Sequence, residues 1–158
     1  MTSLTLAHRR DIDRSKESLV KAAETLLTEA QVTEIPAKEF GHSQLRNLIA
    51  VALETESPAV VLNFIRYQMG RAGRNKGWAN VAVGSDKKLG DRFIEEIEKG
   101  EVARSLAALP SLSGDAMLRQ LAQIELIRHF LGFASRYMKY LDLKRPPRDR
   151  GTEEGDRS

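Results

Sequence analysis

The strongest candidate for chemistry in the sequence is a basic segment that no acidic side chain neutralises. Residues 57 to 85 contain no aspartate or glutamate but four cations: Arg66, Arg71, Arg74 and Lys76. The net charge of this segment is therefore +4, whereas the net charge of the whole chain is only +3. The guanidinium fork of arginine fits a phosphate group, and the glycines nearby let a polyanion approach closely. Cations also favour a helix C-terminus, but that preference does not account for the missing acids. The segment predicts a phosphate-binding surface.

Two further basic features could join this surface. Arg46 follows Ser43, a predicted helix N-cap, and helix N-termini attract anions, although a lone arginine on a helix is more often a solvated side chain. The end of the last predicted helix carries Arg136 and Lys139, and further cations follow it: Lys144, Arg145, Arg148 and Arg150. The helical pair could touch nucleic acid. The later cations fit either nucleic-acid contact or a solubilising extension.

The aromatic residues near the basic segment are few. Only Tyr67 and Trp78 lie close to the cations, and we expect Trp78 to form a lid over the core and Phe64 to be buried. Base stacking needs aromatic faces between cations, so the pattern favours contacts with the phosphate backbone over reading of bases. Such binding has little sequence preference and depends strongly on salt.

Enzymatic signatures are missing from the sequence. There is no cysteine, there are three histidines, and no zinc, phosphate-loop or serine-nucleophile motif is present. Glu125 and His129 are four residues apart and could supply at most two metal ligands from one helix. We expect no catalytic residue, no metal and no cofactor. A metal-dependent hydrolase built on Glu125 and His129 remains the least favoured alternative.

The positions of apolar residues predict helices throughout. Residues three and four apart share one face of a helix, and no segment alternates as a strand does. The predicted helices span residues 13–35, 43–53, 57–70, 89–97, 102–109 and about 27 residues ending at Leu141. We predict an all-α fold, a single bundle of five to six helices with a long C-terminal helix. We expect residues 1–143 to form this domain, with 1–12 as a loose N-terminal arm or a frayed helix start and 144–158 as a disordered charged tail.

Composition is typical of one globular domain. The 158 residues are 41% hydrophobic and 30% charged, and no run approaches the roughly 20 apolar residues that a membrane span needs. Residues 1–15 lack the apolar run of a signal peptide. We therefore expect a cytoplasmic protein without membrane contact.

Three sequence blocks, taken in order, resemble a known family. SQLRNL at 43–48 opens one helix, RYQMGR at 66–71 closes the next, and FLGFASRYMKYL at 130–141 ends the long helix. This arrangement is similar to the small α-helical subunit of type III-A (Csm-type) CRISPR effector complexes. The resemblance implies a non-catalytic, RNA-binding structural subunit. Its copies would stack along the guide RNA–target RNA duplex beside other effector subunits, and its phosphate contacts would come from Arg46, Arg66, Arg71, Arg136 and Lys139.

Two alternatives of related chemistry stay open. The small subunits of type III-B and type I complexes are also helical and basic. Residues 43–56 and 57–70 could instead form a helix-turn-helix pair of a DNA-binding regulator, although Glu54 and Glu56 would place acids in the turn.

Overall fold

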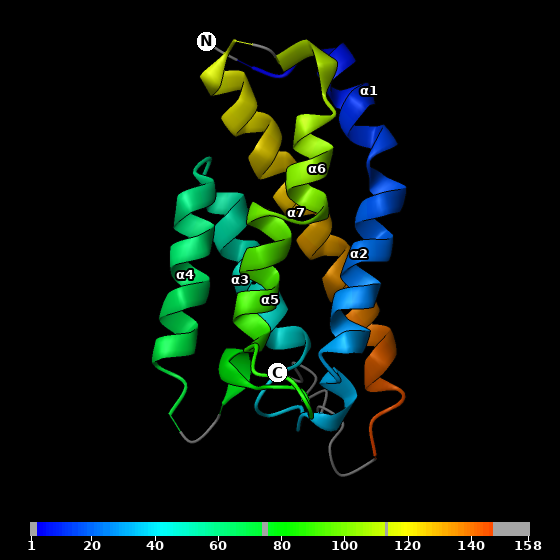
Figure 1. Cartoon of the computed structure of the whole chain (residues 1–158), viewed down its shortest axis with the longest axis vertical. Helices are drawn as coiled ribbons and strands as arrows, with labels where there is room; N and C mark the ends of the chain where they lie inside the picture. Colours follow the sequence, from blue (N-terminus) through cyan, green and yellow to red (C-terminus); the bar gives the residue numbers. More distant parts are fainter. Residues whose placement is uncertain (1–2, 74–75, 113, 147–158) are drawn as a thin grey trace, which may run out of the picture.

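The computed structural model of the protein describes residues 3–73, 76–112 and 114–146. Over these ranges the chain forms α-helices joined by short loops (Figure 1): α1 Leu6–Arg14, α2 Lys16–Glu29, α3 His42–Glu54, α4 Pro58–Gly70, α5 Leu89–Glu98, α6 Glu101–Ala107 and α7 Ala116–Asp142. Three short 3-10 helices lie between them: η1 Val32–Glu34, η2 Gly77–Ala79 and η3 Pro110–Leu112.

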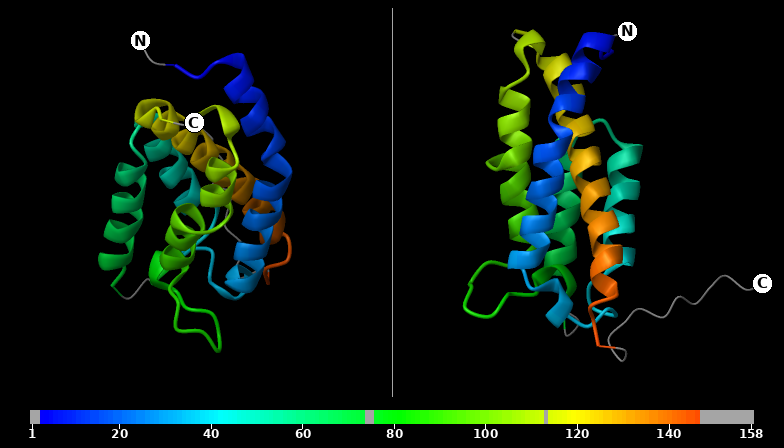
Figure 2. Two further views of the ribbon diagram at one scale, coloured as in Figure 1. Left: turned by 45° about the horizontal axis from the view of Figure 1, so that its top comes forward. Right: turned by 90° about the vertical axis from the view of Figure 1, so that its right-hand side faces the viewer.

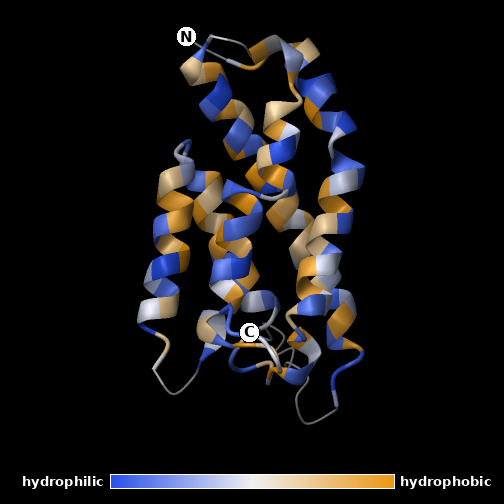
Figure 3. Cartoon of the chain, in the orientation of Figure 1, coloured by the Kyte–Doolittle hydropathy of each residue, from blue (hydrophilic) through white to orange (hydrophobic). Residues whose placement is uncertain are grey.

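The prediction of an all-α bundle with a long C-terminal helix is confirmed. Only Ser15 separates α1 from α2, and the two run as one nearly continuous rod (Figure 2), so the bundle has six rods. Hydrophobic and hydrophilic residues alternate along the helices, as expected where each helix has one buried face (Figure 3). In the part of the chain that the structure describes, no helix has both the length and the apolar character needed to cross a membrane.

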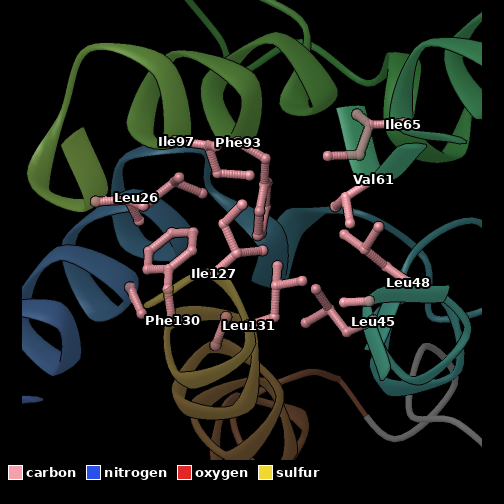
Figure 4. Packing of buried hydrophobic residues seen from close by; sticks show 14 of the residues in the cluster. Leu26, Leu45, Leu48, Val61, Ile65, Phe93, Ile97, Ile127, Phe130 and Leu131 are labelled. Carbon is pink, nitrogen blue, oxygen red and sulfur yellow. The ribbon is translucent and has the colours of Figure 1, made fainter. Parts of the chain in front are cut away.

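The long helix α7 is the centre of the bundle. It packs against α1, α2, α3, α4 and α6. Its buried face meets side chains from α2, α3, α4 and α5 (Figure 4), and the labelled α7 residues there are Ile127, Phe130 and Leu131. The carboxylate of Asp115 caps its first turn by accepting from the backbone N–H groups of Met117 and Leu118, both at 3.1 Å. Its 27 residues match the length predicted from the apolar pattern.

The prediction of a loose N-terminal arm is wrong from Leu6 onward. Thr5 caps α1 reciprocally with His8: the hydroxyl of Thr5 accepts from the His8 N–H, and Nδ1 of His8 accepts from the Thr5 N–H at 3.0 Å. His8 and Ile12 are both buried. Capping and burial together hold this segment as a helix against α7.

The predicted start of a disordered tail at residue 144 is also wrong. Arg145 has only 1% of its surface exposed. Its guanidinium donates to the carbonyl oxygens of Val32 at 3.0 Å and Phe40 at 2.6 Å, and to the Asp142 carboxylate at 3.0 Å. The planar fork thus fastens the chain beyond α7 to the segment between α2 and α3. The rest of the predicted tail, residues 147–158, lies outside the described residues.

Candidate nucleic-acid interface

Packing of α3 against α7 brings two of the predicted cations together. Arg46 lies in the first turns of α3 and Lys139 in the last turn of α7, and these ends lie at the same end of the bundle (Figure 1). Both cations act on His42, the first residue of α3. Burial lowers the pKa of His42, and the positive charges of Lys139 and Arg46 lower it further, whereas Asp142 acts in the opposite direction. The two blocks are distant in sequence, but the positive charges of both act on the same imidazole.

Arg136 extends this site along α7. It is exposed and lies three residues before Lys139, so the two side chains share one side of the helix. The acid nearest to them on α7 is Asp142, whose carboxylate accepts a hydrogen bond from the buried Arg145. We call Arg46, Arg136 and Lys139 the α3–α7 basic patch.

Arg66 does not have the setting that the sequence suggested. Its guanidinium contacts the carboxylate of Glu98, on α5, at 3.3 Å. The expectation that the cations of residues 57–85 have no partner carboxylate is therefore wrong for Arg66, because its partner comes from a different helix. Both side chains are about half exposed, and a surface pair of this kind contributes roughly 0.2–1 kcal/mol.

Arg71 and Lys76 both follow the C-terminal end of α4 in the sequence. Arg71 is exposed just after α4, and its guanidinium lies 5.7 Å from the centre of the Tyr67 ring. It lines a polar hollow of about 400 Å³ between α3, α4 and η2, where the other lining residues include Gln44, Asn47, Gln68 and Trp78. Lys76 is exposed immediately before η2. Arg74 lies outside the described residues.

Trp78 fixes the position of this end, and its prediction as a lid over the core is confirmed. The side chain is buried and meets Phe40 and Phe93 edge-on, with ring centres 4.9 Å and 5.2 Å apart. Gly77 precedes it with a φ of +43°, and a Cβ there would lie 3.1 Å from the carbonyl oxygen of Glu39. Glycine suits this position because other residues rarely adopt this backbone angle and a Cβ would crowd the Glu39 carbonyl oxygen. Phe64, expected to be buried, is half-buried and packs against the core.

The pair considered for metal binding has a structural role. The Glu125 carboxylate accepts from Arg128 at 2.6 Å, and Arg128 also donates to the carbonyl oxygens of Ala52 and Thr55 at the end of α3. Arg128 thereby satisfies carbonyl groups that the end of a helix leaves without partners. His129 stacks on Phe133 at 6.3 Å. Among the described residues, no three histidines, cysteines, aspartates or glutamates are grouped to hold a metal.

The link between His42 and the basic patch gives a first prediction. Lys139→Ala should raise the pKa of His42 toward its ordinary value near 6.5, because one of the two repelling charges is lost. Nuclear magnetic resonance titration of the imidazole measures this. Lys21→Ala, which removes a charge from the exposed face of α2, serves as the control and should leave His42 unchanged. An identical His42 pKa in the wild type and in Lys139→Ala would show that the charge of Lys139 does not act on His42.

The same shift has a consequence for stability. The pKa of His42 is lower in the folded protein than in the unfolded chain. The unfolded chain therefore binds a proton more readily, so the free energy of unfolding falls as pH drops from about 6.5 through the folded pKa. Well above pH 6.5, His42 is neutral in both the folded and the unfolded chain, and the protein keeps its full free energy of unfolding with respect to this group.

Comparison with known proteins adds no relative. No protein-family model matches the sequence, and neither a curated protein nor a solved structure is significantly similar to it. The functional argument therefore rests on the residues and geometry described above.

Proposed function

We propose that the protein is a non-catalytic RNA-binding subunit that holds the phosphate backbone of an RNA duplex. The observation that carries this proposal is the α3–α7 basic patch, in which Arg46, Arg136 and Lys139 come from two helices packed against each other. Arg71 and Lys76 add exposed cations at the ends of the neighbouring elements. Cations on a rigid helical scaffold suit a ligand with regularly spaced negative charges.

The contacts proposed are with phosphates, so binding is largely independent of base sequence. Each phosphate neutralised by a lysine or arginine releases counterions, and affinity falls as salt rises. The bundle serves as a spacer that presents these cations at fixed positions. Chemistry performed on the RNA would belong to other subunits.

We further propose that this subunit belongs to an RNA-guided antiviral complex of the cytoplasm. This assignment rests on the resemblance of residues 43–48, 66–71 and 130–141 to the small subunit of type III-A CRISPR effector complexes. Guide RNA, target RNA, other effector subunits and further copies of the chain are the proposed partners. Purification of the tagged protein from its native cells should recover RNA of uniform length together with such subunits. Recovery of the protein without RNA would contradict this assignment.

Backbone binding is tested by removing two charges of the patch. Arg46→Ala/Lys139→Ala should weaken binding to a short double-stranded RNA by tenfold or more and reduce the slope of log affinity against log salt by about 2. Fluorescence anisotropy between about 50 mM and about 200 mM salt measures both quantities.

A second double variant serves as the control, because it has the same net charge as Arg46→Ala/Lys139→Ala. Lys21→Ala/Arg119→Ala also removes two exposed cations, one from α2 and one from the opposite end of α7. This control should bind as the wild type does. Equal losses in the two double variants would show that only the net charge of the protein matters, and the patch would then have no role.

A further inference from the structure

A stripe of aromatic rings and cations runs along the outer side of α7. Each member has another member three or four residues away, so the set lies on one side of the helix and of the short segment after it. We call this set the α7 stripe: His129, Phe133, Arg136, Tyr137, Tyr140 and Lys144. From His129 to Tyr140 the stripe covers about 16 Å of helix.

Four pairs of residues in the stripe are in contact, either as two rings or as a cation and a ring. His129 and Phe133 are stacked with centres 6.3 Å apart, and the Arg136 guanidinium lies 5.9 Å from the Phe133 centre. Tyr137 and Tyr140 are stacked at 5.8 Å with an angle of 30° between their planes, and the Lys144 ammonium lies 5.2 Å from the Tyr140 centre. Each pair of stacked rings is therefore followed along the stripe by one positive charge.

The rings are held in place yet remain accessible. Phe133 and Tyr137 are half-buried and pack against the hydrophobic core, which fixes their orientation. Tyr140 has 50% of its surface exposed, and Arg136 and Lys144 are exposed as well. Between Phe133 and Lys144 the one acidic residue is Asp142, and Arg145 donates to its carboxylate. From Phe133 to Lys144 the stripe is thus aromatic and positively charged, and the one acid in that stretch of sequence is hydrogen-bonded to Arg145.

We propose that the α7 stripe binds single-stranded RNA by stacking bases on its rings. Aromatic side chains interleaved with cations form the platform on which proteins bind single strands, since every base offers a flat face and every nucleotide a phosphate. Tyr140 is the principal ring, with Tyr137 and Phe133 as its extension. A base that takes the place of the Lys144 ammonium over Tyr140 leaves that ammonium beside the flanking phosphate.

This inference deepens the proposed function, because it assigns a single-stranded segment to a protein already proposed to hold a duplex. The patch and the stripe share Arg136, but the two proposals are tested at different residues. Duplex phosphates need the charges of Arg46 and Lys139, whereas stacking needs the ring of Tyr140. Bases paired inside a duplex keep their faces covered, so a stripe built for stacking selects unpaired nucleotides.

The test compares three ligands by fluorescence anisotropy. They are an oligouridine of about twelve nucleotides, an abasic ribose-phosphate strand of the same length and charge, and a double-stranded RNA of the same length. Wild-type protein should bind oligouridine about tenfold more tightly than the abasic strand, because stacking is lost without bases. Tyr140→Leu should lose about tenfold in affinity for oligouridine and keep its affinity for the duplex within about twofold.

Two variants serve as controls. Tyr140→Phe keeps the ring and should bind oligouridine as the wild type does. Met117→Ala changes an equally exposed apolar residue at the other end of α7 and should leave both affinities unchanged. Far-ultraviolet circular dichroism checks that each variant is folded. We expect Tyr140→Leu to fold, because the side chain of Tyr140 is half exposed.

Each outcome decides one proposal or both. Equal binding of oligouridine and the abasic strand by the wild type overturns the stacking proposal, as does an unaltered oligouridine affinity in Tyr140→Leu. Loss of self-association in Tyr140→Leu with no change in RNA affinity would make the stripe an interface between copies and would also overturn it. If Tyr140→Leu behaves as expected while Arg46→Ala/Lys139→Ala keeps full duplex affinity, the stripe stands and the proposed backbone function falls.

Discussion

Replacing Arg145 by methionine is expected to lower the free energy of unfolding by about 3 kcal/mol. Methionine keeps an apolar stem but donates no hydrogen bond. The carbonyl oxygens of Val32 and Phe40 would lose their guanidinium donor in a buried place, and Asp142 would lose its partner. Urea denaturation followed by circular dichroism measures the change.

The neighbouring lysine provides the control for this prediction. Lys144 precedes Arg145 directly but is exposed, so Lys144→Met should change the free energy of unfolding by less than about 0.5 kcal/mol. Similar small effects in both variants would place Arg145 in solvent, as the composition of residues 144–158 had suggested.

Replacing Trp78 by alanine is expected to cost about 3–5 kcal/mol of folding free energy. The ring fills the space between Phe40 and Phe93, and its loss would leave a cavity beside the hollow lined by Arg71. The free energy of unfolding from urea denaturation measures the loss. Trp78→Phe retains an aromatic edge at the same place and should cost less than half as much.

The chain's only tryptophan also reports directly on its own burial. In the folded wild type, iodide should quench its fluorescence far less than in urea, because the indole is 3% exposed. Equal quenching in the two states would contradict a lid over the core, and Trp78→Ala should then be nearly neutral.

The parts of the fold that the sequence predicted are those set by local signals. The start of α4 follows from Pro58, because proline at the first helical position lacks an N–H that would have no partner there, whereas the side chain of Ser57 makes no capping hydrogen bond. The length of α7 follows from its apolar spacing and from Asp115 as its cap. The capping residue Thr5 and the apolar Ile12 were likewise available as signals for α1, but the polar residues around them obscured the pattern.

The features that local signals miss depend on partners far along the chain. Arg145 lies among prolines, glycines and charges, yet its acceptor carbonyls are more than 100 residues earlier. Arg66 has no acid near it in sequence, and its partner Glu98 is 32 residues away. Both contacts exist only once the helices are packed, so composition around each arginine predicts the wrong environment.

The candidate interface likewise combines features that the local sequence predicts with features that depend on packing. Arg46 and Lys139 are each predicted from the sequence as cations suited to phosphate, but only packing of α3 on α7 brings the charge of Lys139 to act on His42, four residues before Arg46. The α7 stripe, in contrast, had a readable signal. Tyr140 and Lys144 are four apart, as are His129 and Phe133, and such spacing on a predicted helix already places rings and cations on one side.

The central place of α7 has a consequence for synthesis of the protein on the ribosome. It is the last of the described helices to be made, yet α2 and α3 bury their apolar faces against it. At about 5–20 residues per second, translation leaves α2 without that partner for on the order of ten seconds. The nascent chain therefore exposes hydrophobic surface throughout this interval, which makes it a natural client for ribosome-associated chaperones. Assembly of the core is a late event that begins when α7 emerges.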